Sequence, residues 1–146
     1  MKITNKVKVK KIPWVGLGVA SIVAVIVYFA ITSLLFPSTD FDPVLKQAAE
    51  ELNTTTPMLV DEYTQLDNAV ALPNNTFQYN YSLPKNSYKE VSATDVINME
   101  EEFINTIRTN PAMKVFRDND VTINYSYKDK DGVFIAKIVI TPDEYK

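Results

Sequence analysis

The feature that most constrains this chain is an apolar run from Pro13 to Phe36 that contains no Asp, Glu, Lys or Arg. A helix needs about 20 apolar residues to cross the hydrocarbon core of a bilayer, and it satisfies its own backbone hydrogen bonds there. Trp14 lies near the start of the run, where an indole ring suits the membrane interface. The sequence therefore predicts one transmembrane helix over residues 13–36.

The charges around this run predict its orientation. The first acidic residue is Asp40, and the residues before Pro13 include Lys2, Lys6, Lys8, Lys10 and Lys11. Basic residues tend to stay in the cytoplasm, and the run is longer than the apolar core of a cleavable signal peptide. We expect an uncleaved signal-anchor in a single-pass protein of the cytoplasmic (inner) membrane. Its parts are a cytoplasmic basic tail (1–12), the helix (13–36), a linker (37–42) and an extracytoplasmic domain (43–146).

Small residues recur at four-residue spacing within the run, at Gly16, Ala20 and Ala24. This spacing lets two membrane helices approach closely, which would give a homodimer. The alternative is a helix that is simply rich in small residues.

Missing residue types narrow the functions open to the domain. The sequence has no cysteine and no histidine, and Gly132 is the only glycine after the apolar run. Disulfides, thiolate metal sites, histidine bases and glycine-rich phosphate loops are therefore excluded. All eighteen acidic residues follow the run, so the domain is acidic and nucleic-acid binding is disfavoured. We expect neither catalysis nor a cofactor.

Periodicity predicts two helices. Asp42-Pro43 is typical of an N-cap followed by proline at the first helical position, and the helix extends to about Asn53. Ser92 and Asp95 have capping-box spacing and open a second helix that Asn110-Pro111 ends. The apolar positions of the two helices are Val44, Leu45, Ala48, Ala49, Leu52, Val96, Met99, Phe103 and Ile107.

Two hairpins complete the domain. The first has strands at about 63–72 and 76–83, with Leu66, Val70 and Leu72 expected on one face. The second has strands at 121–128 and 133–141, with Asp131-Gly132 at the turn rather than in a calcium loop. The predicted fold class is α+β: an αββαββ two-layer domain with a four-stranded antiparallel sheet and two helices on one face.

Two groups of side chains are candidates for a site. Asp61, Glu62 and Asp67 flank the first strand, where a capping or turn role competes with a divalent-metal or carboxylate-dependent hydrolase site. The second group could line a groove for a partner or be part of the core; it consists of Tyr79, Tyr81, Tyr125 and Tyr127.

Several short patterns resemble a family of uncharacterised small bacterial membrane-anchored envelope proteins. They are Pro57-Met58, Val60-Asp61, Thr64 and Leu66-Asp67-Asn68, then Asn110-Pro111, Met113 and Phe116, and then Tyr125, Tyr127, Asp131 and Gly132. Some members of that family have cysteines that this chain lacks, so no disulfide is carried over. The resemblance implies no activity.

These observations favour a membrane-anchored, non-enzymatic accessory or interaction domain on the outer face of the cytoplasmic membrane. Its partners would be the lipid bilayer and a protein or another envelope component, bound through the sheet face, a sheet edge or the membrane helix. The alternatives are the hydrolase or metal-binding domain and a small-ligand sensor with an aromatic pocket.

Overall fold

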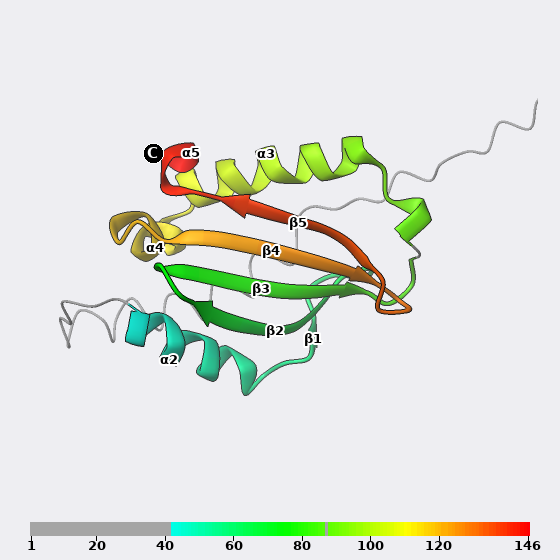
Figure 1. Ribbon diagram of the computed structural model, residues 1–146, viewed down its shortest axis with the longest axis horizontal. Coiled ribbons are helices and arrows are strands. Elements are labelled where there is room, and N and C mark those ends of the chain that lie inside the picture. The colour runs from blue at the N-terminus through cyan, green and yellow to red at the C-terminus, as the bar shows by residue number, and fades with distance from the viewer. Residues whose placement is uncertain (1–41, 87) are drawn as a thin grey trace, which may run out of the picture.

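A mixed five-stranded sheet with helices on one side forms the domain. The computed structural model describes residues 42–86 and 88–146. The strand order is β1-β2-β3-β4-β5, and Figure 1 shows α2 beside β2 and α3 beside β5. The main elements are α2 (Asp42–Asn53), β1 (Met58–Leu59), β2 (Gln65–Leu72), β3 (Thr76–Leu83), α3 (Ala93–Thr109), α4 (Lys114–Asp118), β4 (Thr122–Asp129), β5 (Phe134–Ile140) and α5 (Pro142–Tyr145).

The prediction of a four-stranded antiparallel sheet was wrong. The two predicted hairpin pairings, β2 with β3 and β4 with β5, are antiparallel, but β3 and β4 pair in parallel at the centre. The chain between them includes α3, and such a crossover returns the chain to the same end of the sheet. β1 adds a fifth strand of two residues, which is too short for a periodic signal.

The predicted single-pass membrane architecture is also corrected. Within residues 42–86 and 88–146, every helix is too short or too polar to traverse a bilayer. The segment 13–36 on which that prediction was made lies outside the described residues, as do Gly16, Ala20 and Ala24.

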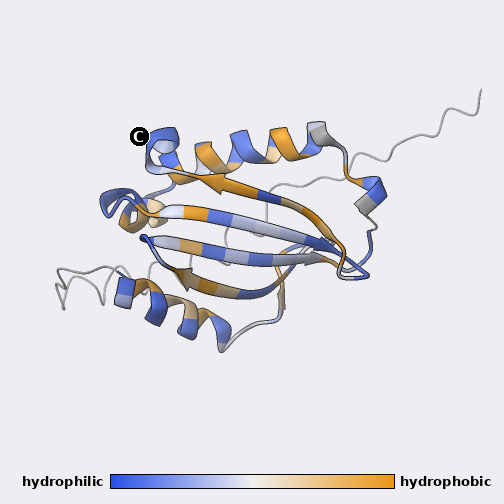
Figure 2. Ribbon diagram, viewed as in Figure 1, coloured by the Kyte–Doolittle hydropathy of each residue, from blue (hydrophilic) through white to orange (hydrophobic). Residues whose placement is uncertain are grey.

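Both predicted helices pack against the same side of the sheet and share one core. α2 buries Leu45, Ala49 and Leu52, and α3 contributes Met99 and Ile107. Figure 2 shows hydrophobic and hydrophilic positions alternating along both helices, as expected for helices with one buried side. The inward rows of the central strands complete this core with Phe77, Tyr79, Tyr81, Ile123, Tyr125 and Tyr127.

The boundaries of α3 confirm the sequence prediction. The backbone N–H of Asp95 donates to Ser92 Oγ at 3.2 Å, and the backbone N–H of Ser92 donates to Asp95 Oδ2 at 2.9 Å. This is a complete capping box. At the other end, Asn110 closes α3, and its side-chain oxygen accepts from Ala112 N–H as a new short turn begins at Pro111.

The predicted face of β2 was wrong because the strand contains a bulge. Leu66 pairs with Tyr81 and Asn68 pairs with Asn80, so Asp67 is an extra residue. The bulge shifts the alternation, since it places one residue more in β2 than in the facing strand. Leu66 and Ala69 are therefore buried, whereas Val70 is 39% exposed.

Candidate interaction surface

The four candidate tyrosines lie on the helix side of β3 and β4. They are buried, with exposed fractions of 1% for Tyr79, 4% for Tyr81, 6% for Tyr125 and 5% for Tyr127. Neighbouring rings stack, with 5.6 Å between the centroids of Tyr79 and Tyr125 and 5.1 Å between those of Tyr81 and Tyr127. Burial raises the pKa of all four phenols above the ordinary value.

These tyrosines form the aromatic centre of the core. The ring of Phe103 from α3 lies parallel to that of Tyr125, with centroids 4.1 Å apart. A sensor with an aromatic pocket needs Tyr81 and Tyr125 to be open to solvent, so their burial argues against that alternative. Partner contact through these tyrosines stays a prediction.

The three candidate carboxylates are engaged in different interactions. Asp61 Oδ1 accepts hydrogen bonds from the N–H groups of Tyr63 and Thr64, at 2.7 and 2.8 Å, and so holds a turn. Glu62 lies 3.6 Å from Lys85 in an exposed ion pair, whereas Asp67 belongs to a polar cluster. Across residues 42–86 and 88–146, the structure contains no group of three or more carboxylates placed to hold a metal ion.

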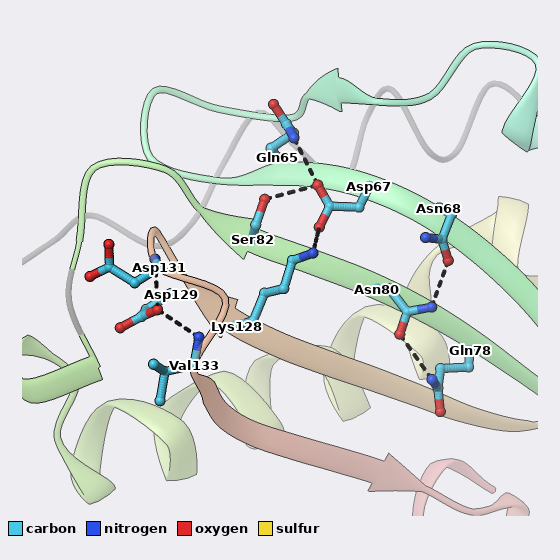
Figure 3. A network of polar contacts seen from close by, with 10 residues as sticks. All are labelled: Gln65, Asp67, Asn68, Gln78, Asn80, Ser82, Lys128, Asp129, Asp131 and Val133. Atoms are coloured by element: carbon cyan, nitrogen blue, oxygen red, sulfur yellow. Dashed lines mark hydrogen bonds and ion pairs between the residues drawn. The ribbon is translucent and has the colours of Figure 1, made fainter.

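The side of the sheet opposite the helices carries a network of polar side chains, which we call the open face (Figure 3). Its residues are the outward positions Gln65, Asp67, Asn68, Val70, Leu72, Thr76, Gln78, Asn80, Ser82, Thr122, Asn124, Ser126, Lys128, Phe134, Lys137 and Val139. Only three of these residues carry charge, namely Asp67, Lys128 and Lys137. The open face is therefore not acidic, although the domain as a whole is.

A chain of side-chain amides crosses three strands of the open face. Asn80 Nδ2 donates to Asn68 Oδ1 at 2.7 Å, and Gln78 Nε2 donates to Asn80 Oδ1 at 2.9 Å. Asn124 Nδ2 donates to Gln78 Oε1 at 3.4 Å. Asn80 and Gln78 each donate one of these hydrogen bonds and accept another, so the chain fixes the orientation of their side chains.

Asp67 is the centre of a second cluster on the same face. Its Oδ1 accepts from Gln65 Nε2 at 2.7 Å and from Ser82 Oγ at 2.9 Å, and its Oδ2 lies 3.1 Å from Lys128 Nζ. Burial opposes ionisation of this carboxyl, but the hydrogen bonds from Gln65, Ser82 and Lys128 outweigh burial and lower its pKa. The bulge between Leu66 and Asn68, which makes the predicted face of β2 wrong, brings Asp67 to this position.

Sequence reasoning identified the buried tyrosine rows as candidates and passed over the polar rows between them. The signal was available, since Thr76, Gln78, Asn80 and Ser82 alternate with buried residues. Alternation of this kind predicts a strand with one buried face, and it does not by itself predict a surface site. The ladder pairs these residues with polar positions on β2 and β4, and that pairing creates the network.

Comparisons with known proteins place the domain in a family and identify its fold. Residues 41–134 match a family model described as a domain of unknown function (DUF8479). An uncharacterised family is thereby confirmed, while the residue pattern on which the resemblance was stated stays a prediction. No curated protein sequence matches the chain.

Three solved structures share this fold. A predicted secreted protein from Pseudomonas aeruginosa has a TM-score of 0.62 and 12% identity, over 73% of this chain and 93% of that one. The pilotin EpsS of the Vibrio vulnificus type 2 secretion system has a TM-score of 0.58 and 8% identity, over 73% and 92%. The type II secretion system pilotin AspS of Vibrio cholerae has a TM-score of 0.56 and 12% identity, over 77% and 98%.

Identities this low establish a shared fold and nothing more. The similar structures are a predicted secreted protein and two secretion-system pilotins, and the described residues form no membrane-spanning helix. The absence of a membrane-spanning helix among the described residues corrects the predicted localisation in a single-pass protein of the cytoplasmic membrane.

Proposed function

We propose that this chain, which belongs to the DUF8479 family of domains of unknown function, is a non-enzymatic accessory domain of the bacterial cell envelope that binds a protein partner. The observation that carries the proposal is the fold shared with two type II secretion pilotins along nearly their whole length. By analogy with proteins that belong to a secretion system, we expect the partner to be a component of the envelope or of a secretion machinery.

The open face supports a binding role. Its polar side chains are joined to one another in fixed orientations, and a pre-ordered surface loses little conformational entropy when a partner binds. Exposed apolar side chains lie at its two margins, with Val70 39% exposed on β2 and Val139 43% exposed on β5. Protein–protein interfaces combine apolar contacts with direct hydrogen bonds, and the open face offers groups of both kinds.

The alternatives receive less support. A carboxylate-dependent or metal-dependent reaction requires converging acidic groups, but Asp61 caps a turn and Asp67 is neutralised by Lys128. The small-ligand sensor requires accessible aromatic rings, and those of Tyr81 and Tyr125 are buried.

Photo-crosslinking in the native host tests the proposal. A photoreactive phenylalanine analogue replaces one residue at a time in the full chain: Val70, Phe134 or the half-buried Ser126 on the open face, and Lys46 or Glu101 on the helices. We expect at least one position to capture the same envelope protein reproducibly. If every position captures only cytosolic proteins or other copies of this chain, the proposed function is wrong.

A further inference from the structure

The two margins of the sheet differ in whether their backbone can accept another strand. On the β2 side, β1 pairs with Gln65 and Leu66. Further along β2, the Asn53 side chain bonds both backbone groups of Ala69, with Nδ2 to O at 2.8 Å and N–H to Oδ1 at 2.7 Å. These contacts occupy backbone groups that a new strand would need, so this margin is closed.

The other margin is the strand β5. Within the described part of the chain, β5 pairs only with β4, and no further strand lies beyond it. A strand with a neighbour on one side directs half of its backbone N–H and C=O groups outward, where they can bond an extended segment. This strand is also seven residues long, whereas β1 has two.

Side chains on the β5 margin are apolar on both sides of the sheet. On the open face, Phe134 is 63% exposed and Val139 is 43% exposed. On the helix side, a small recess between α3 and β5 is lined by Val96, Met99, Ile135 and Ile138, together with Val91 and Tyr127. Figure 2 shows β5 as hydrophobic along most of its length. A strand placed beside β5 would therefore contact apolar neighbours on both faces.

One charged residue interrupts this margin. Lys137 is the middle residue of β5, and its partner in the ladder is Ser126, so it lies on the open face. If two copies of β5 paired with full overlap, Lys137 would lie opposite its own equivalent, and like charges directly opposite are destabilising. A lysine on an edge strand thus disfavours self-pairing, while it attracts an acidic residue on a different chain.

We propose that β5 is a docking edge for an extended segment of an envelope protein, added as a sixth strand, with apolar side chains and an Asp or Glu opposite Lys137. This inference rests on the proposed function, because it names how that protein partner would be held. Backbone hydrogen bonds along β5 would hold the segment, its apolar side chains would cover Phe134 and Val139, and the ion pair with Lys137 would fix its register.

The test compares two exposed apolar positions at opposite margins of the open face. The photoreactive analogue replaces Phe134 on β5 or Val70 on β2 in the full chain, in the native host, and the captured peptide is sequenced by mass spectrometry. We expect Phe134 to capture an acidic, strand-forming segment of an envelope protein, and Val70 to capture none of that segment. Lys137→Glu, introduced together with the Phe134 replacement, should reduce the yield about tenfold, equivalent to ~1.4 kcal/mol.

Lys46→Glu is the matched control, because it makes the same charge change on the exposed side of α2. It should leave the yield unchanged, and both variants should show the circular dichroism spectrum of the parent. Capture of a second copy of this chain, or of residues 1–41 of the same chain, would overturn the docking proposal. So would capture of the envelope protein at other positions but never at Phe134, a result that leaves the proposed function intact. If no position captures an envelope protein, the proposed function itself fails.

Discussion

The side chain of Asn53, at the end of α2, makes both hydrogen bonds of a strand ladder with the backbone of Ala69. Its Nδ2 lies 2.8 Å from Ala69 O, and its Oδ1 lies 2.7 Å from Ala69 N. An asparagine side chain carries the same donor and acceptor as a peptide group, so it can replace one residue of a neighbouring strand. This contact joins α2 to the sheet and closes one of its margins.

Asn53→Ala should lower the free energy of unfolding by about 2 kcal/mol, since it leaves two backbone groups of a buried residue without partners. Urea unfolding followed by circular dichroism measures the change. Asn105→Ala is the control, because Asn105 is exposed on α3, and it should change stability by no more than about 0.5 kcal/mol. Equal losses in the two variants would show that the Ala69 contact contributes nothing.

Much of the secondary structure could be predicted because the signals were local. The Ser92 and Asp95 capping box, the alternation along β3 and the Asp131-Gly132 turn each depend on residues close in sequence, and the structure contains all three. Both helices also bury residues from their predicted apolar faces.

The sheet order and the candidate surface could not be predicted in the same way. Parallel pairing of β3 with β4 depends on where α3 returns the chain, and alternation within a strand is the same for parallel and antiparallel neighbours. The bulge at Asp67 has no signature in composition, yet it determines which residues of β2 reach the open face. The amide chain from Asn68 to Asn124 exists only once the strands are in register.

Asp67→Asn tests the cluster on the open face. The substitution removes the ion pair with Lys128 and should lower the free energy of unfolding by about 1–2 kcal/mol at neutral pH. The pKa of Asp67 is lower in the folded protein, so the ionised carboxylate stabilises the fold above the unfolded-state pKa of about 3.9, and this contribution is lost as the pH falls through the folded-state pKa. Urea unfolding at neutral and acidic pH should therefore show the two proteins converging at acidic pH. A constant difference across that range would contradict this role of the carboxylate.

Asp129 should be essential to the β4–β5 turn. It is 2% exposed, and its Oδ1 accepts from the N–H groups of Asp131 and Val133 at 2.9 and 2.8 Å. Asp129→Ala leaves both donors without this acceptor and should lower the free energy of unfolding by about 2–3 kcal/mol. Asp129→Asn keeps a side-chain oxygen that can accept these hydrogen bonds, so it should lower the free energy of unfolding by less than Asp129→Ala does. Thermal unfolding of the two variants shows which of them is less stable. A larger loss of stability in the asparagine variant would contradict the role of Asp129 as the hydrogen-bond acceptor of this turn.

Tyr145 links the C-terminal helix α5 to the core, and it should make stability fall at alkaline pH. Its hydroxyl donates to Val121 O at 2.9 Å, and burial, with a contribution from Asp120, raises its pKa to about 12. Below pH about 10 the phenol is neutral in both states, and its full contribution is present. Between about 10 and 12 the unfolded chain loses the proton first, so the free energy of unfolding falls as the pH rises.

Tyr145→Phe removes this titration together with the hydrogen bond to Val121. The substitution should lower the free energy of unfolding by about 1 kcal/mol at neutral pH and should make its decline at alkaline pH shallower.

Burial also raises the pKa of Tyr79, Tyr81, Tyr125 and Tyr127, so their ionisation, followed by near-ultraviolet absorbance, should coincide with unfolding followed by circular dichroism. If these phenols ionised near pH 10 while the fold stayed intact, they would be open to solvent, and the aromatic rows would be accessible to a partner.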